Sequence, residues 1–416
     1  PPVRQPGLAM RDPLAAADQD SKRTHSLKLR NVTEQDILTT ERLERFRGRA
    51  AEYDAENRFF AEDLAELAEA GYLTALVPAE FGGLGLSLEQ TARLQVRLAG
   101  AAPATALAVN MHLVWTGIPK TLRDRDDDSL EFVLREAGAG EVFAFGLSEA
   151  GNDLVLFGST TEARPEPDGG YRFFGAKIFT SLSPAWTRLG TMGLDTASAD
   201  GPKIVYGFIE RTGGGFEIRE DWDTLGMRAT QSNTTVLDGA PARADRIVRR
   251  LDPGPNLDPL VFAIFANFEI LLAAVYTGIG ARALELGVAA AKRRTSLKNN
   301  GRSYANDPDI RWRVAEAAID QDALLPQLDA IARDVDALAD HGPQWFPQLV
   351  RMKVRATETP RRVVDQAIRV SGGSVFFAGN ELGRLYRDVL AGIFHPSDAE
   401  SAHTTVANAW LGPIEE

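Results

Sequence analysis

The 416-residue chain contains no cysteine and only five histidines. Disulfide bonds, thiolate nucleophiles and zinc–cysteine sites are therefore excluded, and we expect a cytoplasmic protein. The histidines lack metal-ligand spacing such as HExxH, so no metal site is expected. The chain also lacks a basic excess, since 46 Lys and Arg face 58 Asp and Glu for a formal net charge of −12. This charge argues against nucleic acid as a partner, because non-specific binding needs a basic face.

The N-terminus lacks an apolar stretch typical of signal peptides. We interpret residues 1–33 as a flexible arm or a cloning remnant. The longest apolar run, residues 261–281, is long enough to span a membrane. However, Asn267 and Glu269 lie near its centre, where a charge would be costly in lipid. We therefore expect a buried helix in this place and no membrane partner.

The hydrophobic pattern changes twice along the chain. Residues 34–141 carry apolar side chains at three- and four-residue spacing, which is typical of helices. Residues 142–250 contain short aromatic and β-branched runs separated by glycine turns, which are typical of antiparallel strands. After a proline-rich joint, residues 258–416 are helical again in four long segments. This order predicts an α+β fold.

Four motifs occur in order along the chain: FGLSEAGND at 145–153, GAKIFTSLS at 175–183, LGMRATQSNTTVLDGAPARADRIV at 225–248, and SGGSVFFAGNELGRLYRD at 371–388. Together they resemble the acyl-CoA dehydrogenase family over roughly residues 34–411. The resemblance implies an N-terminal helical domain, a middle antiparallel β-barrel domain and a C-terminal four-helix bundle. It also implies an FAD enzyme that removes an α-proton from an acyl thioester while the β-carbon gives hydride to flavin N5.

The first two motifs are the expected flavin site. A flavin ring needs hydrogen-bond donors at its pyrimidine edge and a flat partner against one face. Ser148 and the backbone of Leu147 suit the edge, whereas Phe179 and Ser181 suit a face and N5; from the residues alone, Phe179 could instead be a core aromatic. The resemblance adds contacts to the flavin of a neighbouring subunit, which implies a homo-oligomer, either a dimer or a tetramer. The cofactor-binding candidates are Phe145, Leu147, Ser148, Asn152, Phe179, Ser181, Arg294, Ser296, Arg369, Gly372 and Gly373.

The catalytic glutamate that is usual in the family is missing from its expected place. Counted from the Arg387–Asp388 pair without gaps, that place is occupied by Pro396, and His395 precedes it. Proline cannot accept a proton. The loop with His395 and Pro396 thus lies where the resemblance places the catalytic base. If the protein uses a base, it must be a group other than Pro396.

Glu269 is the main candidate for this base, because it is the only charged residue in the apolar run. A base needs a carboxylate whose pKa is raised by burial. Alternatively, Glu269 pairs with an arginine of another helix, such as Arg369 or Arg384. Asp398 is a weaker candidate, since it could instead be the N-cap of a helix.

Three functions remain open. The first is an acyl-CoA or acyl-carrier-protein thioester dehydrogenase that uses FAD and passes electrons to an electron-transfer flavoprotein or another acceptor. The second is a flavin-dependent monooxygenase that uses reduced FMN or FAD and O2, resembling the dibenzothiophene and nitrososynthase enzymes; here His395 would move protons, because imidazole titrates near neutral pH. The third is a catalytically inactive flavin-binding relative. The flavin loops favour the first function, and the missing glutamate favours the other two.

Overall fold

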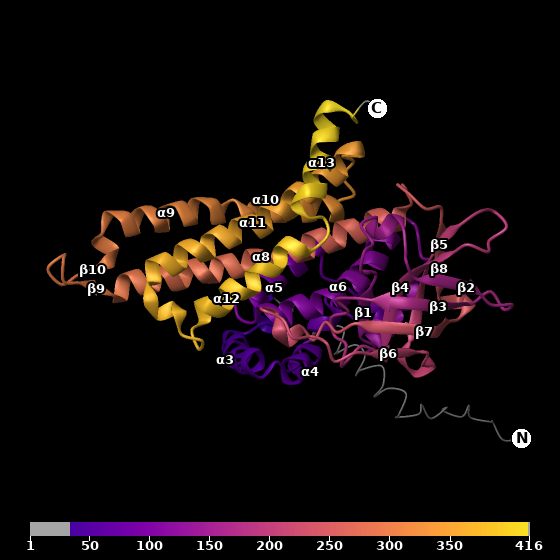
Figure 1. The fold of residues 1–416 in the computed structure, drawn as a ribbon, viewed down its shortest axis with the longest axis horizontal. Helices are drawn as coiled ribbons and strands as arrows, with labels where there is room; N and C mark the ends of the chain where they lie inside the picture. Colours follow the sequence, from indigo (N-terminus) through magenta and orange to yellow (C-terminus); the bar gives the residue numbers. More distant parts are fainter. Residues whose placement is uncertain (1–33, 415–416) are drawn as a thin grey trace, which may run out of the picture.

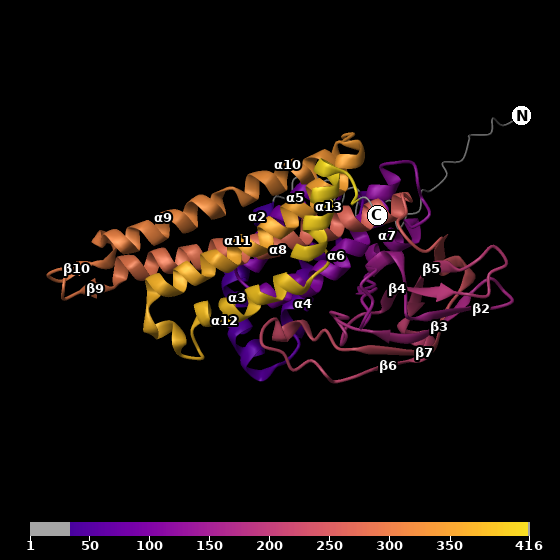
Figure 2. The same cartoon turned by 45° about the horizontal axis from the view of Figure 1, so that its top comes forward.

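The computed structural model describes residues 34–414, with helices at both ends of this range and the strands between them (Figure 1). The predicted arm, residues 1–33, lies outside the described residues. Among the N-terminal helices, α6 lies between the sheet and the long C-terminal helices, and α3 and α4 lie below these long helices in the view of Figure 1 (Figures 1 and 2). Their bounds are α2 Glu34–Ile37, α3 Thr40–Glu56, α4 Ala61–Glu69, α5 Leu88–Ala99, α6 Pro103–Arg123 and α7 Glu131–Gly138.

The middle of the chain forms one eight-stranded sheet in the order β6-β7-β3-β2-β4-β5-β8, with β1 pairing with β4. Most neighbours are antiparallel, as predicted, but β1–β4 and β2–β4 are parallel. A parallel pair needs a long connection, and the β2–β3 hairpin between β1 and β4 supplies it. No pair joins the edge strands β6 and β8 among the described residues, so the predicted antiparallel barrel is corrected to an open mixed sheet. The strands are β1 Phe143–Gly146, β2 Glu162–Pro165, β3 Tyr171–Lys177, β4 Arg188–Asp195, β5 Lys203–Glu210, β6 Phe216–Ile218, β7 Thr235–Ala242 and β8 Ile247–Leu251.

The C-terminal part is a bundle of long helices that extends away from the sheet (Figure 1). The Asp307 side chain accepts the backbone N–H groups of Asp309 and Ile310 and so caps α9, and Pro308 occupies its first turn. The helical segment that follows Asp307, the second of the four predicted after residue 258, is interrupted at Ala323 and forms two helices. The bounds are α8 Pro259–Arg293, β9 Thr295–Ser296, β10 Arg302–Ser303, α9 Pro308–Asp322, α10 Leu324–Asp336, α11 Trp345–Ser371, α12 Glu381–Val389 and α13 Ala399–Leu411.

The apolar run is the core of helix α8, which contacts α5, α6 and α11. Within the described residues, α8 alone is long and apolar enough to cross a membrane, and 83% of its most apolar window is buried inside the protein. This burial is what a bundle core helix requires, since its side chains are apolar on all faces. The prediction of a buried helix is confirmed.

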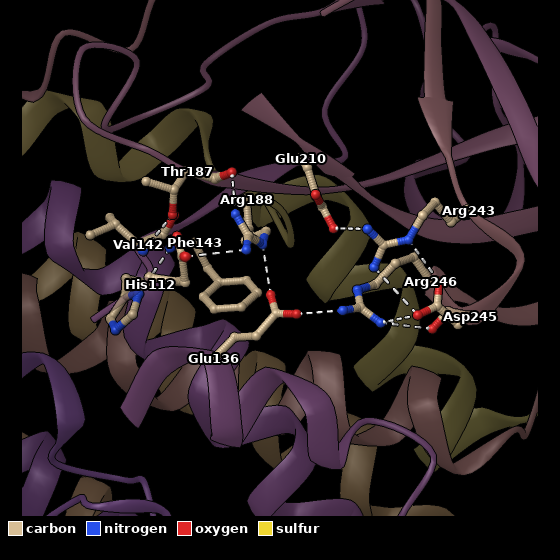
Figure 3. A network of polar contacts seen from close by, with 11 residues as sticks. His112, Glu136, Val142, Phe143, Thr187, Arg188, Glu210, Arg243, Asp245 and Arg246 are labelled. Carbon is tan, nitrogen blue, oxygen red and sulfur yellow. Dashed lines mark hydrogen bonds and ion pairs between the residues drawn. The ribbon is translucent and has the colours of Figure 1, made fainter. Parts of the chain in front are cut away.

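Polar contacts fix the sheet to the N-terminal helices (Figure 3). Glu136 of α7 accepts from Arg188 Nε of β4 at 2.6 Å and from Arg246 Nη2 at 2.5 Å. His112 of α6 accepts the Phe143 N–H on Nδ1 at 3.0 Å, so its other nitrogen, Nε2, donates to the Leu73 carbonyl at 2.8 Å. Burial lowers the pKa of His112 to about 4, which keeps the ring neutral. His112 thus has a structural role at the start of β1.

Candidate active site

A cavity of about 580 Å³ lies where loops of the sheet meet α6, α8 and the segment after α12. Its walls are mainly apolar, with aromatic rings from both the sheet and α8. Phe145 at the end of β1 and Phe268 of α8 stack with ring centroids 5.6 Å apart. The volume is in the range of cofactor and small-molecule sites. Eight of the predicted site residues line it: Phe145, Leu147, Ser148, Asn152, Phe179, Ser181, Glu269 and His395.

The loop after β1 is held by a buried ion pair. Lys177 Nζ donates to Glu149 Oε1 at 2.5 Å, and both side chains have no exposed surface. Burial alone would raise the pKa of Glu149, but the Lys177 charge and several hydrogen bonds lower it to about 2. The Asn152 side chain donates to Glu149 Oε2 at 3.0 Å and to the Gly158 carbonyl at 2.9 Å. Asn152 therefore stabilises the conformation of this loop, and it also lines the cavity.

Phe179 presents its ring to the cavity. It follows β3 with a left-handed backbone (φ 56°), which is uncommon for a bulky residue. Its side chain is 53% exposed, so the alternative of a core aromatic is wrong. The ring lies edge-on to Trp222, with centroids 6.0 Å apart and planes at 88°. A strained backbone that exposes an aromatic ring is typical of a ligand contact.

The residues present fit a flavin ring. Phe179 offers an exposed aromatic face, and the remaining walls are apolar. Hydroxyl groups are also present in the lining: Ser148 lines the cavity, and Ser181 Oγ lies 2.8 Å from the Oγ of Ser232, which lines it too. A flat heterocycle with an apolar body and a polar edge matches this combination.

Glu269 lies in the cavity wall and is 1% exposed. Its Oε1 accepts the N–H and the hydroxyl of Ser397, each at 3.1 Å, whereas Oε2 has no hydrogen-bond partner among the described residues. Burial raises the pKa of Glu269 to about 7, although Lys353 and Ser397 oppose the shift. The predicted alternative of a pair with Arg369 is wrong, because Arg369 pairs with Asp365 at 2.7 Å. Arg384 makes no ion pair with Glu269 among the described residues.

Lys353 of α11 was not among the site residues predicted from the sequence. It is 1% exposed, and its Nζ donates to the carbonyls of His395 at 2.7 Å and Ser397 at 2.6 Å. It therefore fixes the segment that carries His395 and supplies a positive charge near Glu269. Helical periodicity was the available signal, since Lys353 lies on the buried face of α11 with Leu349 and Ala356.

His395 is half-buried at the cavity and lies beside a tyrosine. Its Nε2 is 2.8 Å from the Tyr276 hydroxyl. Burial and the Lys353 charge lower the pKa of His395 to about 3, so the imidazole is neutral near pH 7. Asp398 does not line the cavity; its Oδ1 accepts the Ser401 N–H at 2.9 Å and caps α13. Of the two expectations for Asp398, the structure shows the N-cap of α13 and not a base at the cavity.

The Arg–Asp pair of the last motif joins α12 to the loop before β7. Buried Asp388 accepts the Met227 N–H at 2.6 Å, and Arg387 forms an ion pair with Asp54. Gly226 lets the two backbones approach, because a Cβ there would come within 2.3 Å of the Arg387 carbonyl oxygen. The pair therefore shapes one cavity wall.

The other five predicted cofactor contacts lie at the far end of the bundle from the sheet, near the β9–β10 hairpin (Figures 1 and 2). Arg294 follows the last turn of α8, 25 residues after Glu269, which corresponds to roughly 37 Å along a helix. Its Nη1 donates to the Val370 carbonyl at 2.8 Å. The contact of these five residues with the flavin of a neighbouring subunit stays a prediction. The group comprises Arg294, Ser296, Arg369, Gly372 and Gly373.

Comparison with known proteins gives consistent matches. Models of the acyl-CoA dehydrogenase N-terminal and C-terminal domains match residues 40–120 and 270–397. An amino sugar nitrososynthase of Streptomyces peucetius is 30% identical over 78% of this chain and 80% of that protein. A putative acyl-CoA dehydrogenase of Bacillus subtilis is 29% identical over 88% of this chain and 93% of that protein. A solved structure of KijD3 with FMN and dTDP-3-amino-2,3,6-trideoxy-4-keto-3-methyl-D-glucose has 25% identity and a TM-score of 0.79, covering 98% of this chain and 96% of that one.

The chain belongs to the acyl-CoA dehydrogenase family, which confirms the prediction from the four motifs. The α+β fold class is confirmed as well. The protein is a flavin-dependent oxidoreductase on this fold, and its relatives include both nitrososynthases and acyl-CoA dehydrogenases.

Proposed function

We propose that the chain is a flavin-dependent monooxygenase that uses reduced flavin and O2. The observation that carries this proposal is the loop after α12, where Pro396 occupies the place of the usual glutamate and His395 faces the cavity. The relative that is 30% identical is named a nitrososynthase, which supports an oxygenating reaction. We propose FMN as the flavin, because the solved relative holds FMN; FAD, expected from the family, is the alternative.

Each residue of the site has a task in this reaction. When bound, reduced flavin activates O2 so that one oxygen atom reaches the substrate and the other leaves as water. The apolar walls exclude bulk water, which limits unproductive side reactions. The His395 imidazole is neutral and lies 2.8 Å from the Tyr276 hydroxyl, so it can offer a hydrogen bond at the cavity. Its pKa of about 3 makes it a weak proton acceptor near neutral pH, which corrects the expectation that it moves protons. Lys353 holds this segment in place through two backbone carbonyls.

A second function, acyl thioester dehydrogenase, is favoured by one observation. Glu269 is a buried carboxylate at the cavity, and its pKa of about 7 suits a base at neutral pH. In this reaction Glu269 would take the α-proton. The relative named as a putative acyl-CoA dehydrogenase supports it.

Anaerobic mixing separates the two functions. Oxidised, flavin-loaded protein is mixed with acyl-CoAs of different chain length, and the visible flavin absorbance is followed. We expect no bleaching with any thioester, whereas photoreduced protein should consume O2. Bleaching that is abolished by Glu269→Gln while flavin remains bound would overturn the monooxygenase proposal in favour of the dehydrogenase.

A further inference from the structure

We propose that Glu269 is a positioning residue: together with Lys353 it holds residues 395–397, the clamp segment, in the cavity wall and so sets the place of the His395 ring. His395 and Pro396 of this segment line the cavity. The inference rests on the proposed monooxygenase function, because it names the residues that place His395 for that reaction. Glu269 thus acts through the segment and not on a substrate.

The clamp segment needs partners from other parts of the chain. It lies just before α13, and Pro396 in its middle has no backbone N–H to donate. The carbonyls of His395 and Ser397 accept from Lys353 Nζ of α11 at 2.7 and 2.6 Å. The Ser397 N–H donates to Glu269 Oε1 of α8 at 3.1 Å. Because a buried backbone group without a partner is costly, these two side chains stabilise the path of the segment.

The Glu269 carboxylate is bound to the segment and is not open to the cavity. Its Oε1 also accepts the Ser397 hydroxyl at 3.1 Å, so both donors of Ser397 share one oxygen. Oε2 has essentially no accessible surface, and the whole residue is 1% exposed. A general base must come within hydrogen-bond reach of the proton that it removes. In this conformation the carboxylate reaches Ser397 and not a molecule in the cavity.

Opposite charges hold the two sides of the clamp together. Lys353 and Glu269 are both almost fully buried, and burial of either charge alone would be costly. The Lys353 charge favours the ionised form of Glu269. An ionised carboxylate accepts stronger hydrogen bonds from Ser397 than a neutral acceptor would. The two side chains therefore support each other while both bind the segment.

A third contact fixes the ring of His395. Tyr276 lies seven residues after Glu269 on α8, hence on the same helix face, and it is fully buried. Its hydroxyl is 2.8 Å from His395 Nε2. Helix α8 therefore binds the segment at its backbone through Glu269 and at its side chain through Tyr276. Loss of the Glu269 contact should move the ring relative to Tyr276.

The test follows the segment itself in oxidised, flavin-loaded protein. Glu269→Leu removes the acceptor, so amide hydrogen exchange in peptides that contain Ser397 should become about tenfold to a hundredfold faster, as two lost hydrogen bonds imply. The NMR signal of the His395 ring, assigned by its loss in His395→Asn, should shift. Glu269→Gln keeps an acceptor oxygen and should restore most of the protection and the wild-type signal. Lys353→Met should give the same changes as Glu269→Leu.

Glu285→Gln is the matched control, because Glu285 lies on α8 but its side chain is 67% exposed. It should change neither readout. The ring signal of buried His112, which does not line the cavity, reports on the overall fold. If Glu269→Leu shifts this signal as well, Ser397→Ala decides. That variant removes one of the two donors and should give a smaller rise in exchange, with the His112 signal unchanged.

Unchanged exchange and an unchanged His395 signal in Glu269→Leu, or in Ser397→Ala where the first variant alters the fold, would overturn the inference. Changes in Glu269→Gln as large as those in Glu269→Leu would overturn it too, because the acceptor would then not matter. None of these readouts requires turnover, so each failure leaves the monooxygenase proposal intact. An intact clamp in protein that forms no O2-dependent product would instead reject the monooxygenase proposal alone.

Discussion

Replacing Lys177 by methionine should destabilise the protein by about 3–5 kcal/mol, because it leaves the Glu149 carboxylate buried without its cation. The pKa of Glu149 gives a magnitude for Lys177 and the hydrogen-bond donors together. The pKa of Glu149 falls from 4.5 to about 2, which corresponds to about 3 kcal/mol of stability at neutral pH. This contribution is fully present above pH 4.5 and is lost as the pH falls toward 2, because the unfolded state binds the proton more readily.

The pair itself should add little net stability. Burial lowers the pKa of Lys177 from 10.5 to about 8 despite the charge of Glu149, so burying its ammonium costs nearly as much as the pair gains. The double variant Glu149→Gln/Lys177→Met should therefore recover more than half of the stability lost in Lys177→Met.

Urea denaturation of the flavin-free protein measures this cycle at pH 7, with exposed Lys298→Met as a control expected to stay within about 0.5 kcal/mol. A cost below about 1 kcal/mol for Lys177→Met, or strict additivity in the double variant, would contradict the predicted dependence of Glu149 on its cation. Either result would mean that the carboxylate is held by its other hydrogen-bond donors, such as the Thr160 N–H at 2.7 Å.

Three further predictions concern Gly226 and His395 at the cavity and Asp398 outside it, with Gly48 as a comparison for Gly226. Gly226→Ala should lower the free energy of unfolding by about 1–3 kcal/mol and weaken flavin binding, because the added Cβ would lie 2.3 Å from the backbone of α12. Gly48→Ala should raise the free energy of unfolding by about 1 kcal/mol in thermal unfolding, because a Cβ there has no atom within 4 Å. His395→Asn should lower oxygenated product formation about tenfold at unchanged flavin affinity, because it removes the hydrogen bond with Tyr276 at the cavity, and an unchanged rate would remove His395 from the reaction. Asp398→Ala should cost about 1 kcal/mol through the lost cap of α13. A loss of activity as large as that of Glu269→Gln would instead return Asp398 to the role of base.

The sequence predicted the cavity well where its residues lie in local motifs. Ser148 and Phe179 belong to loops that follow β1 and β3, and the Ile178 N–H joins these loops by donating to the Ser148 carbonyl at 3.0 Å. Motif spacing captures such residues because each loop is short. Glu269 was predicted from its isolation in an apolar run, which is also a local signal.

Long-range contacts could not be predicted in the same way. The charge of Lys353 opposes the rise in the pKa of Glu269 from another helix, 84 positions away in the chain. No motif near either residue in the sequence indicates that the two lie close together. Ser397 similarly reaches Glu269 through a loop whose path depends on Lys353. The parallel pairing of β1 with β4 was missed because strand patterns reveal which face is buried, but not which strands are adjacent.

The most direct test of the account is a titration of flavin-free protein with FMN and FAD, oxidised and photoreduced, followed by flavin fluorescence. We expect one flavin to bind per chain and Phe179→Ala to weaken its binding, because this ring is the exposed aromatic face of the cavity. Absence of binding by both flavins in both redox states would contradict the central claim that the cavity between the sheet and α8 is a flavin site.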